Sequence, residues 1–419
     1  MKVGIYLTNQ HPPGTDMIPA LEEQFAMVRA ARDRGWDAVA TGQHYLSEGM
    51  AQLQLVPFLS RLAAEADGMT GIAGVLLLSL HNPVELAEHV ASLDVIWKGN
   101  FVFGVGLGYR EVEFDAFGVP RGQRIRRFEE CLTLIKRLWT EDAVSFESDV
   151  CKLDKVSMTI RPVQRPHPPI WFAATTDRAI ERAARLGDTW FIGPHATFPT
   201  LVRQLSLYRA ALSRCGKPLP RELPILREIF CARDRTAALQ IAGPHLANKY
   251  GAYARWGQDG ALPATESFQR PFEDLVRNRF ILGSPEECYE QLRPYWETLG
   301  VTTFLFRTHW SGLPASATLQ HAADQRRASA CAAPGNPQGR LSLMHPQDTS
   351  TEAEALQREI QRRLGGPSRL RLALDMSVAA RALALACLQQ RHPGYSELEL
   401  KKALLRLMFA ADNLPPPLQ

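Results

Sequence analysis

The chain has 419 residues, and its 45% hydrophobic, 22% charged and 8% aromatic content is typical of a compact globular protein and excludes a disordered, collagen-like or coiled-coil chain. Its 48 basic and 44 acidic residues give a net charge of only +4, and without a dense basic run nucleic-acid binding is disfavoured. The seven scattered cysteines contain no C-x-x-C pair, and no apolar run reaches the ~18 residues of a membrane helix, so we expect a cytoplasmic protein without disulfides, thiolate zinc or membrane segments.

Short apolar runs alternate with amphipathic segments through the first 140 residues, the pattern of repeated strand–helix units. The run at 71–78 is continuously apolar, as expected for a strand buried on both faces. The helix predicted at 123–140 places four apolar side chains inward, Ile125, Phe128, Leu132 and Ile135. The predicted strands are 2–7, 38–41, 71–78 and 101–106, and the predicted helices are 19–34, 53–66, one beginning at Pro83, and 123–140.

Residues 141–168 interrupt this rhythm with several prolines, and we predict an excursion there with a short β pair at 144–146 and 152–153. Four further strands follow, at 170–174, 189–192, 225–231 and 303–306. Eight strand–helix units predict a (β/α)8 TIM barrel with insertions over residues 1–313. The alternative, an open dinucleotide-binding sheet, needs a glycine-rich turn after its first strand, where the sequence reads TNQHPP; we discard it.

The last hundred residues differ in composition from the barrel. Residues 314–350 are rich in Ala, Ser, Gln, Gly and Pro and predict a flexible linker. Two capping boxes, Thr351-x-x-Glu354 and Ser396-x-x-Glu399, open helices in the segment that follows. We therefore predict a small all-α module of three helices at 351–412.

Functional side chains of parallel barrels lie at the carboxyl ends of the strands, where the second strand is followed by Gln43-His44-Tyr45. An imidazole there can give or take a proton near neutral pH; alternatively, His44 only caps its loop. Arg227 and Glu228 also pass this positional filter. Five histidines share this end of the strands, but their spacing does not support a metal site, and we expect none: His11, His44, His81, His195 and His309.

Two other strand ends suit a phosphate or a planar ring. The turn Gly104-x-Gly106-x-Gly108-Tyr109-Arg110 lets backbone N–H groups approach a ligand closely. Thr175-Thr176-Asp177 opens a helix, where hydroxyls and free N–H groups converge on a positive helix end. A plain helix N-cap explains the second motif equally well.

Four runs taken together resemble the bacterial luciferase-like flavin-dependent monooxygenase family over about residues 1–312. They are Gln43-His44-Tyr45, GVLLLSLHNPVELAE at 74–88, GNFVFGVGLGYREVEFDAFG at 99–118 and AARLGD at 183–188. The resemblance implies an insertion-bearing (β/α)8 barrel, usually a homodimer. It also implies that reduced FMN, or in a sister branch a deazaflavin, binds at the carboxyl-terminal mouth.

The resemblance assigns roles residue by residue. His44 matches the family's active-site histidine, which assists the oxygen chemistry of the flavin, and Gly74-Val75 matches a non-prolyl cis peptide under the flavin ring. Leu107 stands where some members have an arginine to the phosphate, a role that Arg110 would take over. The cofactor-binding positions implied are Gly74, Val75, Gly106, Gly108, Tyr109, Arg110, Thr175 and Thr176.

The function expected from the resemblance is oxygenation of a small organic substrate with reduced FMN and O2, the reduced flavin coming from a separate flavin reductase. One alternative is a deazaflavin-dependent dehydrogenase on the same barrel. Another is a non-catalytic flavin-binding scaffold in which the helical module makes the interactions.

Overall fold

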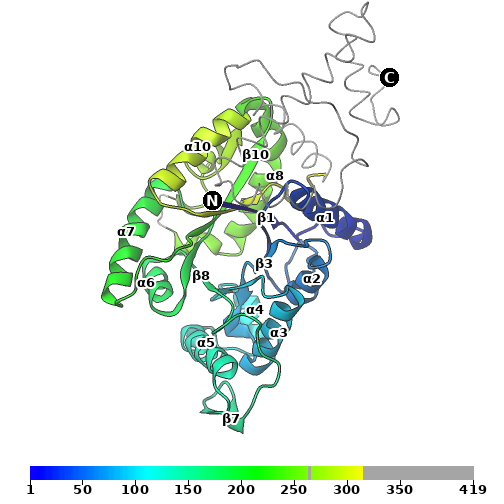
Figure 1. Cartoon of the computed structure of the whole chain (residues 1–419). Coiled ribbons are helices and arrows are strands. Elements are labelled where there is room, and N and C mark those ends of the chain that lie inside the picture. The colour runs from blue at the N-terminus through cyan, green and yellow to red at the C-terminus, as the bar shows by residue number, and fades with distance from the viewer. Residues whose placement is uncertain (263–265, 315–419) are drawn as a thin grey trace, which may run out of the picture. The chain divides into compact units, whose positions relative to one another are not determined.

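The described part of the chain is a closed parallel barrel, and the computed structural model describes residues 1–262 and 266–314 (Figure 1). Its eight strands are β1 (Lys2–Leu7), β2 (Ala38–Thr41), β3 (Thr70–Ala73), β5 (Phe101–Gly106), β8 (Ile170–Ala174), β9 (Thr189–Ile192), β10 (Pro224–Cys231) and β12 (Thr303–Arg307). β1 pairs with both β2 and β12, and the pair Ile225–Ile192 joins β10 to β9 and closes the ring. The predicted TIM barrel is confirmed.

Helices surround the strands (Figure 1). The residues that begin these helices act locally. The Asn82 side chain accepts from the Val84 backbone N–H at 2.9 Å, and Ser284 and Glu287 form a capping box. Both arrangements pair backbone N–H groups that the first turn of a helix leaves without a partner. The main helices are α1 (Met17–Arg32), α2 (Leu55–Leu62), α3 (Pro83–Ile96), α5 (Arg124–Thr140), α6 (Asp177–Leu186), α7 (Phe198–Arg214), α8 (Arg235–Arg255) and α10 (Pro285–Glu297).

The interior of the barrel is filled by one cluster of buried side chains, Tyr6, Ala38, Ala40, Ile72, Val102, Trp171, Phe191, Leu226 and Leu305. Because residues two apart share a face of a strand, the next inward positions lie at the carboxyl-terminal mouth. On β2, β3, β5 and β9 these positions are glycines, Gly42, Gly74, Gly104 and Gly193, whereas on β10 and β12 they are Glu228 and Arg307. Four of the eight positions are therefore glycines and two carry large charged side chains. We call the side of the mouth at β2, β3 and β5 the glycine half and the side at β10 and β12 the charged half.

Two predictions about local structure are wrong. The strand predicted at 71–78 is divided into β3, β4 (Leu76–Leu77) and a 3-10 turn at Leu78–Leu80, because backbone groups there bond to side chains: the Gly74 carbonyl accepts from the Tyr6 hydroxyl at 2.6 Å, and the Leu77 N–H donates to Gln43 at 3.1 Å. Ile125, predicted to face inward, is 38% exposed, because the first turn of α5 lies at the exposed end of that helix, before its buried stripe.

Several short elements escaped the sequence analysis because each is too short to show a period. They are α4 (Glu111–Ala116), a 3-10 turn (Gln258–Ala261), α9 (Phe272–Val276) and β11 (Ile281–Gly283), which pairs in parallel with β10. The predicted β pair in the excursion is confirmed as the antiparallel strands β6 (Val144–Glu147) and β7 (Lys152–Val156).

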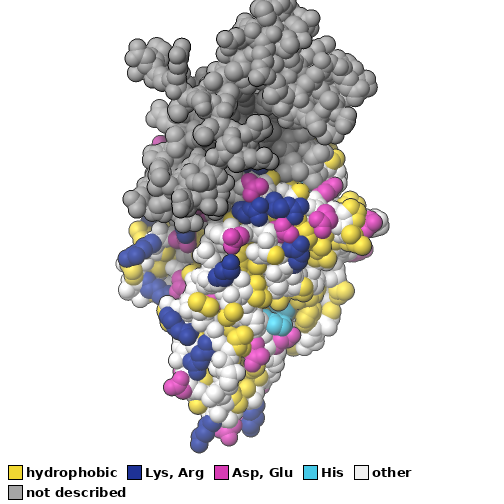
Figure 2. Space-filling view, turned by 45° about the vertical axis from the view of Figure 1, so that its right-hand side comes forward, with side chains coloured by type: hydrophobic (Ala, Val, Ile, Leu, Met, Phe, Trp, Pro, Cys, Tyr) yellow, Lys and Arg dark blue, Asp and Glu magenta, His cyan; other side chains and the backbone are white. Residues whose placement is uncertain are grey.

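The chain divides into two units, Met1–His321 and Ala322–Gln419. The predicted linker at 314–350, apart from Pro314, and the predicted module at 351–412 lie outside the described residues. No helix in the described ranges is long and apolar enough to cross a membrane. On the face shown in Figure 2, basic and acidic side chains are interspersed, which agrees with the weak net charge.

Removing the tail after Ala330 is expected to leave a folded, flavin-competent barrel. Trp310 and Leu313 are 0% and 5% exposed and belong to a buried cluster, so the cut has to fall beyond them. Circular dichroism melting and FMN binding of the shortened chain would measure this. Truncation after His309, which removes Trp310, serves as the destabilised control, and aggregation of the chain cut after Ala330 would show that the tail completes the barrel.

Candidate active site at the barrel mouth

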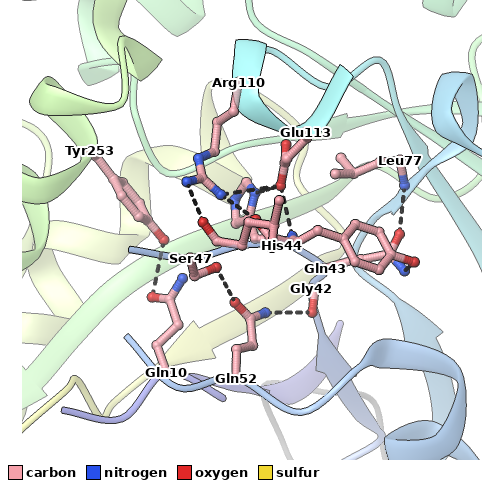
Figure 3. A network of polar contacts seen from close by, with 12 residues as sticks. Gln10, Gly42, Gln43, His44, Ser47, Gln52, Leu77, Arg110, Glu113 and Tyr253 are labelled. Atoms are coloured by element: carbon pink, nitrogen blue, oxygen red, sulfur yellow. Dashed lines mark hydrogen bonds and ion pairs between the residues drawn. The ribbon is translucent and has the colours of Figure 1, made fainter. Parts of the chain in front are cut away.

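His44 follows β2 and is held by a buried carboxylate that sequence reasoning missed. Its Nδ1 lies 3.1 Å from Oε1 of Glu113 on α4, and the Tyr45 backbone N–H donates to the same oxygen at 2.8 Å (Figure 3). The Glu113 side chain is fully buried and that of His44 is 15% exposed. A carboxylate at Nδ1 selects the tautomer that carries its proton there and leaves Nε2 as the basic ring atom.

Arg110 holds the loop that carries His44. Its guanidinium donates to the backbone carbonyls of Tyr45 at 2.6 Å and Leu46 at 2.9 Å and lies 3.4 Å from Glu113. It also lies over the ring of Trp256, 4.3 Å from the centroid. These contacts give Arg110 a role in the His44 loop, and its predicted contact with a flavin phosphate stays a prediction.

Gln43, on the other side of His44, ties the end of β2 to β4. Its Oε1 accepts from the Leu77 N–H at 3.1 Å, and its Nε2 donates to the Tyr45 hydroxyl at 2.8 Å. Oε1 of Gln43 also lies 3.2 Å from Nε2 of His81. Burial raises the pKa of Tyr45 to about 12, so its phenol stays protonated in this network.

In the glycine half of the mouth, backbone segments approach one another closely. The Gly74–Val75 peptide bond is cis, as the resemblance implies. A Cβ on Gly104 would come within 1.9 Å of the Ala73 carbonyl oxygen, and one on Gly106 within 2.5 Å of the Val75 side chain, so only glycine permits this close approach. The glycines of β5 therefore let the Gly74–Val75 segment lie directly against this strand, at the place where the resemblance puts the flavin ring.

The predicted phosphate residues occupy the start of α6. The Thr176 hydroxyl accepts from the Ala179 backbone N–H at 3.3 Å and acts as the N-cap. The Thr175 carbonyl accepts from the Gln204 side chain at 2.7 Å. The N-cap interpretation therefore holds for Thr176, while phosphate binding by Thr175 and Thr176 stays a prediction.

The fold and the residues at its mouth were compared with known proteins. A family model described as luciferase-like monooxygenase matches residues 1–303. The chain belongs to the luciferase-like monooxygenase family. The resemblance identified from the sequence is therefore confirmed over the barrel.

Named members of this luciferase-like family differ in cofactor. The chain is 23% identical to the oxygenase component of a flavin-dependent trigonelline monooxygenase of Acinetobacter baylyi, over 68% of this chain and 82% of that protein. It is 26% identical to an FMNH2-dependent dimethylsulfone monooxygenase of Pseudomonas putida, over 58% and 70%. It is also 26% identical to an F420-dependent glucose-6-phosphate dehydrogenase of Nakamurella multipartita, over 66% and 84%.

Among solved structures, the monooxygenase RslO1 of Streptomyces bottropensis superposes with a TM-score of 0.68. It is 26% identical, and the match covers 77% of this chain and 97% of that one. The luciferase-like barrel of this chain is therefore matched by nearly the whole of a monooxygenase.

The charged half of this luciferase-like barrel is a second buried cluster, centred on Glu228. Oε1 accepts from Lys249 on α8 and, at 2.8 Å, from Arg307, and Oε2 accepts from the Trp310 indole at 2.6 Å. Burial opposes ionisation of Glu228, but the charges of Lys249 and Arg307 outweigh it and lower its pKa to about 2. Burial and then the Arg307 charge lower the pKa of Lys249 to about 7.

Sequence signals for these residues were partial. Glu228 passed the strand-end filter, and Glu113 lies inside the run that carries the family resemblance, three residues after Arg110. Lys249 lies on α8 and Trp256 directly after it, in a part of the sequence that shows no motif, so nothing in the sequence pointed to them. Within residues 1–262 and 266–314, no group of three His, Cys, Asp or Glu side chains could hold a metal ion.

Proposed function

We propose that this protein is an oxygenase component that uses reduced FMN and O2 to oxygenate a small organic substrate. The observation that carries the proposal is the pairing of His44 with buried Glu113 beside a glycine-lined half of the barrel mouth. A separate flavin reductase would supply the reduced flavin, as the name of the Acinetobacter relative as an oxygenase component suggests. The homodimer implied by the family remains part of this proposal, to be checked by sedimentation.

Reduced FMN, when bound, supplies the electrons that activate oxygen. The residues of the chain have three tasks around it. The glycines at 104 and 106 let the Gly74–Val75 segment, which would lie under its ring, pack against β5, and the Tyr6 hydroxyl holds the Gly74 carbonyl. Glu113 holds His44 so that Nε2 can give or take a proton. Trp256, whose ring centroid lies 5.7 Å from that of His44, helps to exclude water from it.

A deazaflavin-dependent dehydrogenase is the second candidate, because an F420-dependent dehydrogenase is among the relatives. The same His44–Glu113 pair would then assist hydride transfer without oxygen. Reduced F420 binding more tightly than reduced FMN would favour this candidate. A scaffold without turnover would bind a flavin and consume no substrate.

Reduced FMN is expected to bind about tenfold or more tightly than reduced riboflavin, because hydrogen bonds to a charged phosphate contribute about 1.5–3 kcal/mol. Anaerobic titration measures both affinities. Thr175→Val should reduce this preference. Thr133→Val, which removes a hydroxyl bonded within its own helix, should leave it unchanged. Equal affinity for the two flavins in the natural chain would remove the phosphate site.

A further inference from the structure

One face of α8 crosses the barrel mouth. Lys249 and Tyr253 on α8, and Trp256 directly after its last residue, follow one another at spacings of four and three, which places them on one side of the helix. Lys249 contacts Glu228 on β10. The Tyr253 hydroxyl donates to Gln10 beyond β1 at 3.5 Å (Figure 3). Trp256 contacts His44 beyond β2. This face therefore spans the mouth from its charged half to the catalytic loop.

The Glu228 cluster holds α8 in this position. Glu228 is fully buried and its two oxygens accept from Lys249, Arg307 and Trp310. If α8 moved away, Lys249 would separate from Glu228 and buried charges would be left unpaired in the protein interior, which is costly. The α8 face is therefore a fixed wall of the site.

Two residues of this wall, Tyr253 and Trp256, meet the rings of His44 and Tyr109, and we call these four side chains the aromatic cluster. The ring centroids of Tyr109 and Trp256 each lie 5.7 Å from that of His44, and those of Tyr253 and Trp256 are 5.6 Å apart. Aromatic rings at such distances prefer edge-to-face and tilted contacts. A planar aromatic ring of a ligand can make the same edge-to-face and tilted contacts with these side chains, whereas a puckered aliphatic ring cannot.

The Tyr109 hydroxyl is buried and has no hydrogen-bond partner within the described residues. Burial, together with Tyr253 and Glu113, raises its pKa well above the ordinary value, so it remains a donor. Buried donors in native proteins are almost always paired. An acceptor oxygen of a ligand would complete this one.

Charge nearby selects against a cationic ligand. Lys249 and Arg307 share the single carboxylate of Glu228, and Arg110 already occupies a face of Trp256. The Arg110 guanidinium already takes the cation–π position on that face of Trp256, so a further cation is disfavoured there.

We propose that the aromatic cluster is the substrate subsite and that it takes a planar aromatic compound carrying a hydrogen-bond acceptor oxygen. This inference rests on the proposed function, since it names the class of substrate for the same site. The Tyr109 hydroxyl donates to the acceptor oxygen, and Trp256 packs against the ring next to His44.

Three small probes separate the two features of the ligand. Acetophenone has the ring and the oxygen, ethylbenzene lacks the oxygen, and cyclohexyl methyl ketone lacks the planar ring. Ligand-observed NMR titration of the full chain, with and without FMN, gives the three affinities. Acetophenone should bind about fivefold or more tightly than either of the others, as a hydrogen bond and an aromatic contact each contribute about 1 kcal/mol.

Two variants assign the preferences to residues. Tyr109→Phe should bring acetophenone to the level of ethylbenzene, and Trp256→Leu should bring it to the level of cyclohexyl methyl ketone. Tyr289→Phe, at an exposed tyrosine, and Trp36→Leu, at the opposite end of β2, are the matched controls and should keep both preferences. If Trp256→Leu does not fold, Tyr109→Phe decides alone.

Equal affinities of the natural chain for all three probes would overturn the inference, as would an unchanged preference in Tyr109→Phe. Titration with reduced FMN separates this failure from failure of the proposed function. Tight reduced FMN binding without probe preference overturns only the subsite. Probe preference without reduced FMN binding supports the subsite and overturns the oxygenase proposal.

Discussion

Replacing His44 by alanine should lower turnover about 10²-fold or more while the fold and reduced FMN binding stay intact. The loss is that of a positioned general acid or base. The geometry supports it, because Glu113 selects the tautomer of His44 through Nδ1. Turnover with the true substrate and anaerobic FMN titration measure the two effects separately.

Glu113→Gln is the informative companion variant. An amide oxygen can still accept from Nδ1 of His44, but a hydrogen bond to a neutral amide is weaker than one to a carboxylate. We expect a smaller loss of turnover than in His44→Ala. Normal turnover of His44→Ala would assign His44 to loop capping alone.

Replacing Glu228 by leucine should lower the free energy of unfolding by about 3–5 kcal/mol, because it leaves Lys249 and Arg307 buried without their carboxylate. Both side chains are nine-tenths or more buried. Denaturant unfolding measures the change. Glu129→Leu is the matched control, because Glu129 also pairs with two arginines, Arg182 and Arg185. Those ion pairs lie at the partly exposed surface, where an ion pair contributes about 1 kcal/mol or less to the free energy of unfolding.

The effect of Glu228 should depend on pH. Its pKa is lowered from 4.5 to about 2 in the folded chain, so the unfolded chain binds its proton first as the pH falls. Its stabilising contribution is therefore complete above about pH 4.5 and is lost as the pH falls towards 2. The difference in stability between the natural chain and Glu228→Leu should shrink over that interval, and a constant difference would contradict the ionised network.

The sequence alone determined the barrel, because each strand is marked by a local run of apolar residues bounded by polar turns. β1, β2 and β5 have the predicted bounds, and the predicted β pair of the excursion formed as well. The division of the run at 71–78 was not predictable, since it depends on Tyr6 and Gln43 from other strands.

The same distinction applies to the site. The strand-end rule and the family resemblance found His44, Gly74 and Tyr109 because barrel topology brings all strand ends to one mouth. Glu113, Lys249, Trp256 and Arg307 acquire their roles only through contacts with residues tens to hundreds of positions away. A buried charge or aromatic wall is defined by its partners and by the exclusion of water, and only the tertiary structure decides these.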